Sequence, residues 1–180
     1  MKKETKKQLL IGAALVLELL FLLLYLNGRI DRLLDSDMSS EMILGQLLAR
    51  NNGILSDQWY YSTELRVLNT QLIYALFFRL SSNWHFVRMA STLVLWCVLI
   101  ASYGVLCRVM GCKKSFGVTA LLLAAPVSES YFRFVLAGVY YVPHLAIAFA
   151  ALALNEAYFK AQTDRKKFWL VVSVLLALVA

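Results

Sequence analysis

Long apolar runs alternate with shorter polar segments along the chain. The apolar runs predict membrane-crossing helices over 9–26, 86–107, 115–134, 138–158 and 168–180. As a helix the first run is about 27 Å long, just enough to cross a bilayer core of roughly 30 Å. The last run reaches only about 20 Å. Either it is not a full span or the sequence is the front part of a longer protein, and we favour the second interpretation.

The longest polar segment, 27–85, predicts an outer loop that contains two amphipathic helices. Asp37 can cap a helix over 38–51, and Thr63 can cap a second helix that ends near Leu80. One face of the first helix is apolar, which places it along the membrane surface or against the bundle. That face consists of Ile43, Leu44, Leu47 and Leu48.

Composition and charge extend this pattern to the whole chain. Hydrophobic residues make up 61% of the sequence, which is typical of membrane proteins and excludes a soluble globule. All lysines fall in three clusters, at 2–7, 113–114 and 160–167. By the positive-inside rule these clusters and the N-terminus lie in the cytoplasm. We therefore predict an all-α, multi-pass protein of the cytoplasmic membrane, with 1–180 as a single transmembrane domain of about five spans.

The net charge of +7 does not indicate nucleic-acid binding, because aromatic and basic residues do not interleave on one exposed segment. Membrane lipid is the expected partner. The sequence does not predict the oligomeric state.

Candidate chemistry is concentrated in the outer loop. In an extended segment Asp35 and Asp37 point to the same side, where they can hold a divalent cation such as Mg or Mn. Alternatively, one carboxylate is a general base and the other orients it, with Glu41 one turn further on. Aspartate and serine are also good helix caps, so a purely structural role for this segment stays open.

The predicted outer side carries arginines and no lysines: Arg29, Arg32, Arg50, Arg66, Arg79, Arg88 and Arg133. A guanidinium group suits phosphate oxygens, so a lipid phosphate or diphosphate is a natural ligand. Pairing with nearby acids is the alternative, and Glu129 with Arg133 has the i,i+4 spacing for it. His144 follows Pro143 at the same level and is a further polar candidate.

This combination resembles the N-terminal part of the GT-C superfamily of membrane glycosyltransferases. The resemblance covers most of the chain in architecture, and its motifs are Asp35-Ser36-Asp37 and the stretch 60–66. It implies that Asp35 or Asp37 is the catalytic acid residue or a metal ligand, and that the donor is a sugar on a polyprenyl phosphate. The candidate substrate-binding residues are Glu41, Glu64, Arg66, Arg133 and His144.

Two functions follow from these observations. The first is transfer of a sugar, a hexose or a pentose, from a polyprenyl-phosphate-linked donor to an acceptor at the outer face of the membrane. The second is a transporter or flippase-like bundle, or a non-catalytic assembly partner. It would use Glu18, Glu129 and Arg133 as polar contacts within the membrane.

Overall fold

The protein is built from helices, as a computed structural model covering residues 2–61, 68–161 and 163–179 shows. No strand occurs in these ranges, which confirms the all-α class. In chain order the elements are α1 (Lys2–Asn27), the 3-10 turn η1 (Ile30–Leu33), α2 (Ser36–Asn51), α3 (Thr70–Phe78), α4 (Trp84–Met110), α5 (Lys113–Ala124), α6 (Glu129–Tyr131), the π-helical η2 (Phe132–Ala137), α7 (Val142–Lys160) and α8 (Thr163–Val179).

Three helices in the described part of the chain are long and apolar enough to cross a membrane. They are Lys6–Asn27 of α1, Trp84–Met110 and Val142–Lys160. A bent pair, Lys113–Ala124 with Glu129–Ala137, makes a fourth crossing if it is counted as one span. The prediction of five spans is not confirmed, because α8 has only 17 residues and falls short of a full span.

The third predicted span, 115–134, is broken into two parts. α5 ends at Ala124, and Pro126, which has no backbone N–H, lies in the break that follows. The Ser128 hydroxyl then accepts a hydrogen bond from the Tyr131 amide at 3.1 Å and starts a new helix. The two parts meet at 89°, so the apolar run does not form the single helix that its hydropathy suggests.

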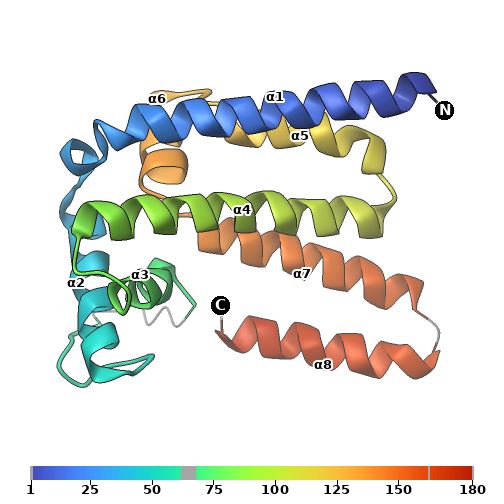
Figure 1. The fold of residues 1–180 in the computed structure, drawn as a ribbon. Coiled ribbons are helices and arrows are strands. Elements are labelled where there is room, and N and C mark those ends of the chain that lie inside the picture. Colours follow the sequence, from blue (N-terminus) through green and yellow to red (C-terminus); the bar gives the residue numbers. More distant parts are fainter. Residues whose placement is uncertain (1, 62–67, 162, 180) are drawn as a thin grey trace.

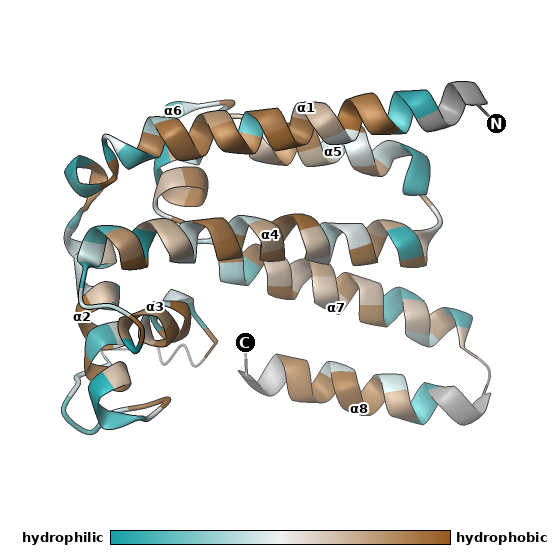
Figure 2. Cartoon of the chain, viewed as in Figure 1, coloured by the Kyte–Doolittle hydropathy of each residue, from teal (hydrophilic) through white to brown (hydrophobic). Residues whose placement is uncertain are grey.

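The apolar core lies where the last turns of α1, the middle of α4 and η2 meet. Its fully buried members include Leu22, Leu26, Leu95, Trp96, Leu99 and Leu136. The Trp96 Nε1 donates to the Leu136 carbonyl at 2.9 Å, which attaches the π-helical segment to α4. Figure 2 shows the apolar residues spread along these helices and the polar ones gathered at their ends.

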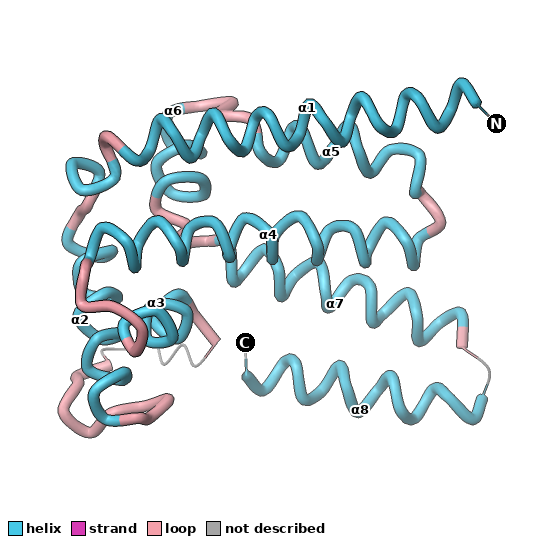
Figure 3. Tube along the Cα trace, viewed as in Figure 1, coloured by secondary structure: helices cyan, strands magenta, loops and turns pink. Residues whose placement is uncertain are grey.

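The long helices run side by side, and α4 lies between α1 with α5 on one side and α7 on the other (Figure 1). α2 and α3 pack together beside the start of α4, at one end of this bundle. The N-terminus and the turn between α4 and α5 lie at the other end, and the loops of Figure 3 fall largely at these two ends. The bundle thus separates the α2–α3 pair from the lysine-rich turns.

Arg88 connects the α2–α3 end to the bundle. Its side chain is only 2% exposed, and one terminal nitrogen donates to the Ile30 carbonyl at 2.6 Å. The other contacts the Leu33 carbonyl at 3.4 Å and the Met38 sulfur at 3.1 Å. Its donors are thus engaged by backbone and sulfur, so Arg88 is not one of the phosphate-binding arginines that the sequence suggests.

His85 makes further contacts in the same region, on its more exposed side. His85 Nδ1 lies 2.9 Å from Asp31 Oδ2, and its Nε2 lies 3.1 Å from Asn27 Oδ1. The imidazole therefore joins the end of α1, the η1 turn and the start of α4.

The helical face of α2 differs from the predicted one. Met38, Met42 and Leu48 are buried together with Leu44, whereas Ile43 is 47% exposed. The buried face of α2 is rotated by about one residue from the predicted face. The reason is that α2 packs on α3 and on Arg88. α3 covers only part of the predicted second helix, and residues 63–67 of that prediction lie outside the described ranges.

Gly45 allows α2 and α3 to approach closely. A Cβ added there would lie 2.6 Å from the Tyr74 Cβ and 3.0 Å from the Gln71 carbonyl oxygen. Tyr74 is fully buried in this contact, and burial raises the pKa of its hydroxyl while the Arg88 guanidinium acts in the opposite direction. Neither backbone can move without disturbing the other helix.

We predict that Gly45→Ala destabilises the protein by about 1–3 kcal/mol, because the added methyl group overpacks the α2–α3 contact. Gly12→Ala is the matched control, since no atom lies within 4 Å of a Cβ at that position. Thermal unfolding in detergent checks both variants. Equal melting temperatures for Gly45→Ala and the wild type would show that the two helices are not in this contact.

Candidate functional site

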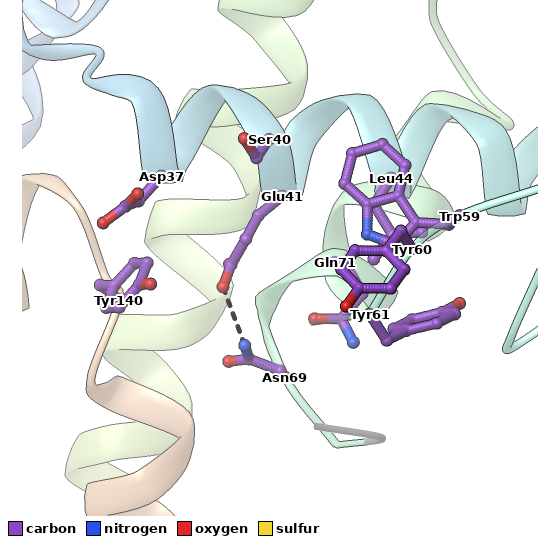
Figure 4. Close-up of a pocket in the computed structure, with 10 residues that line it drawn as sticks. All are labelled: Asp37, Ser40, Glu41, Leu44, Trp59, Tyr60, Tyr61, Asn69, Gln71 and Tyr140. Atoms are coloured by element: carbon purple, nitrogen blue, oxygen red, sulfur yellow. Dashed lines mark hydrogen bonds between the residues drawn. The ribbon is translucent and has the colours of Figure 1, made fainter. Parts of the chain in front are cut away.

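A cavity of about 330 Å³ opens at the α2–α3 end of the bundle. Four parts of the chain contribute to it: α2, the connection after α2, the start of α3, and the turn before α7. Its lining residues, drawn in Figure 4, are Asp37, Ser40, Glu41, Leu44, Trp59, Tyr60, Tyr61, Asn69, Gln71 and Tyr140. The volume is within the range typical of small-ligand sites.

Two carboxylates project into this cavity from successive turns of α2. Figure 4 shows Asp37 and Glu41 pointing toward Tyr140 and Asn69. Glu41 Oε1 accepts a hydrogen bond from Asn69 Nδ2 at 2.8 Å, which fixes its orientation. Asp37 is exposed and has no hydrogen bond or ion pair to any described residue. One carboxylate is thus held in place, and its neighbour is available to a ligand.

The two aspartates of the Asp35-Ser36-Asp37 motif have different surroundings. Asp35 Oδ1 accepts a hydrogen bond from the Met38 amide at 2.9 Å, so Asp35 is the N-cap of α2. The predicted cap, Asp37, lies instead inside the first turn. The expectation that the two side chains share one side is wrong, because α2 starts between them.

This separation bears on the suggested cation site. No three His, Cys, Asp or Glu side chains of the described chain converge to bind a metal ion. Asp35 Oδ1 is already occupied by the helix cap, and Asp35 does not line the cavity. Among the described residues, Asp35 and Asp37 therefore do not form the Mg or Mn site that the motif suggested.

An aromatic wall faces the carboxylates across the cavity. It comes from the connection after α2, where Asn52 adopts a left-handed conformation with φ of 51°. Ser56 stabilises this connection through two hydrogen bonds. Its amide donates to the Tyr61 hydroxyl at 2.9 Å, and its hydroxyl accepts from the Gln58 amide at 3.2 Å. Trp59 and Tyr61 also pack on the buried cluster of α2 and α3, so the wall has a fixed base.

The other predicted site residues lie elsewhere. Arg133 is exposed on η2, and His144 is half-buried in the first turn of α7 with its ring 6.2 Å from that of Tyr141. Neither lines the cavity. Glu129 does not form the expected ion pair with Arg133, although both are described; helical geometry changes from α to π between them. Glu64 and Arg66 lie outside the described residues.

Three polar residues of the cavity were missed by sequence reasoning. Asn69 and Gln71 flank the first residue of α3. Tyr140 lies 99 positions beyond Glu41 in the sequence. The asparagine before an apolar helix is a usable signal, because asparagine favours the N-cap position. Nothing local identifies Tyr140, since it reaches the site only through the bend after α5.

The arrangement combines an available carboxylate, a fixed carboxylate–amide pair and aromatic faces in an open cavity. Such a site can hold a polar ligand in one orientation and accept a proton from it. No family model, curated protein or solved structure matches this chain. The functional argument therefore rests on the fold and on this cavity.

We predict that Asp35→Ala lowers the free energy of unfolding by about 1 kcal/mol, whereas Asp35→Asn has little effect because asparagine also caps helices. Asp37→Ala should cost less, about 0.3–0.5 kcal/mol, since Asp37 has no described partner and only its favourable charge in the first turn of α2 is lost. Chemical denaturation in detergent, followed by circular dichroism, measures all three. A larger loss for Asp37→Ala than for Asp35→Ala would reverse the assignment of the cap.

Proposed function

We propose that this chain is a membrane glycosyltransferase, or the N-terminal part of one, that uses a sugar linked to polyprenyl phosphate. The observation that carries the proposal is the Asp37 carboxylate in an open cavity beside the Glu41–Asn69 pair. The cavity also lies at the end of apolar helices, where a lipid-linked donor can reach it from the bilayer.

In the proposed reaction Asp37 is the general base. It takes the proton from an acceptor hydroxyl, and the hydroxyl oxygen forms a bond to the anomeric carbon of the donor sugar. The bond between that carbon and the polyprenyl phosphate oxygen breaks, and the phosphate leaves with the electron pair. Glu41 and Asn69 hold the acceptor in position, and Asp35 supports α2 without touching substrate.

The aromatic wall and the amide groups suit a sugar acceptor. Ligand pockets combine aromatic surface with a few placed polar groups that fix orientation. Here Trp59 and Tyr60 supply the surface, and Asn69 and Gln71 supply the amides. Arg133, exposed on the segment that leads to Tyr140, is our candidate for the donor phosphate.

A second function, transport, has one observation in its favour. The α5–η2 segment is a broken helix, and discontinuous helices often form substrate sites in transporters. In that case Glu18, half-buried within the first span, becomes the main polar contact. The two functions therefore depend on different carboxylates.

We predict that Asp37→Asn lowers sugar transfer by about 100-fold or more, which is the usual contribution of a general base. The assay follows label from radioactive polyprenyl-phosphate-linked hexoses and pentoses into acceptors in membranes that contain the protein. Asp35→Asn and Glu18→Gln are the controls, and both should keep transfer within a few-fold of wild type. Wild-type transfer by Asp37→Asn would exclude its catalytic role.

A further inference from the structure

A second cavity, also about 330 Å³, lies at the opposite end of the bundle from the α2–α3 pair. It opens between the end of α4 and the start of α5. Its lining residues are Gly104, Cys107, Arg108, Lys113 and Phe116. It has no part in the proposed transfer reaction, so its role is an independent question.

Apart from two cations, the residues that line this cavity are small or apolar. Cys107 is only 2% exposed, and Phe116 stacks on Tyr103 with ring centroids 6.1 Å apart. The chain turns back at Gly111, whose φ of +80° suits glycine, and this tight turn brings α5 against α4. The cavity is therefore a feature of the helix pair and not of a loose loop.

Two cations stand at its mouth. Arg108 and Lys113 are exposed, and neither forms an ion pair with any described residue. Lys113 is the first residue of α5, and no acidic residue occurs in that first turn. A cation at a helix N-terminus is electrostatically unfavourable because it adds to the positive end of the dipole. The mouth thus carries positive potential that the described chain does not neutralise.

Lys160, at the same end of the bundle, is by contrast a lysine with a structural role. Its Nζ lies 2.8 Å from Glu156 and donates to the Val109 carbonyl at 2.8 Å. This lysine joins α7 to the end of α4 and is charge-paired. Arg108 and Lys113 have no comparable arrangement.

We propose that this cavity binds the headgroup of an anionic glycerophospholipid. The phosphodiester would lie between Arg108 and Lys113, where a guanidinium and an ammonium group both match phosphate oxygens. The acyl chains would run along α4 over Val105 and Val98, which are 54% and 39% exposed and lie on the same helical face as Arg108. Exposed apolar side chains on the face of α4 that also carries Arg108 suit a lipid and not free phosphate, as in basic interhelical pockets of other membrane proteins.

The experiment measures lipid retention by the purified full chain in detergent, using native mass spectrometry. The probes are phosphatidylglycerol, phosphatidylcholine with the same acyl chains, and inorganic phosphate as competitor. Arg108→Gln and Lys113→Gln are the test variants. Lys167→Gln is the matched control, because Lys167 is exposed near the start of α8, which lies at the same end of the bundle, but does not line the cavity.

We expect the wild type to retain phosphatidylglycerol in preference to phosphatidylcholine. Each test variant should weaken this binding about fivefold, the effect of one interfacial basic side chain, and the double variant about 30-fold. Lys167→Gln should change it less than twofold. An equal loss in Lys167→Gln would show general surface attraction and overturn the site. Equal retention of both lipids, or full displacement by millimolar inorganic phosphate, would also overturn it.

Discussion

A buried guanidinium is costly unless its donors are satisfied, and this requirement organises the α2–α3 end of the protein. Arg88 projects from α4 and satisfies its donors with the carbonyls of Ile30 and Leu33 and with the Met38 sulfur. These acceptors belong to the η1 turn and to the first turn of α2. Hydrogen bonds to charged groups are worth about 1.5–3 kcal/mol each, so the guanidinium fixes where α2 begins relative to the bundle.

The position of α2 in turn determines the cavity. Asp35 caps the helix and Asp37 and Glu41 follow on its first turns, so the carboxylates of the cavity are placed by the same turn that Arg88 holds. Asn69 then connects Glu41 to the start of α3. Gly45 allows α3 to lie close enough for this contact. The proposed catalytic group thus depends on packing well outside the cavity.

The two ends of the bundle have different chemistry. The α2–α3 end combines carboxylates, amides and aromatic rings, whereas the other end has Arg108 and Lys113 over an apolar wall. This division agrees with the lysine clusters of the sequence, which all fall away from the α2–α3 end. A lipid headgroup held at the basic end and a lipid-linked sugar at the other would both approach from the bilayer. The two proposals nevertheless involve separate residues.

Sequence patterns predicted some levels of this structure well and others poorly. Hydropathy located α1, α4 and α7 because long apolar helices need no partner to be recognised. It failed at the third span, where Pro126 and the Ser128 cap outweigh the apolar run. Local rules also chose the wrong cap for α2, since Asp35 and Asp37 are both good cap residues and tertiary contacts decide between them.

The site was predicted only in part, for a related reason. Asp37 and Glu41 were identified because acidic residues in a polar loop stand out, and both line the cavity. Tyr140 and Asn69 could not be assigned to them from sequence, because long-range packing brings these segments together. Arg88 looked like any outer arginine until its burial showed a structural role.

The most direct test of this account is the side of the membrane on which the cavity opens. Two proteins with a single thiol each are needed, with Cys97 and Cys107 replaced by alanine in both. One keeps the exposed Cys112 at the lysine-rich end, and the other carries Cys112→Ala with Ser40→Cys at the cavity. A membrane-impermeant maleimide should label Ser40→Cys in intact cells and Cys112 only after permeabilisation. Labelling of both thiols from the same side would contradict the account.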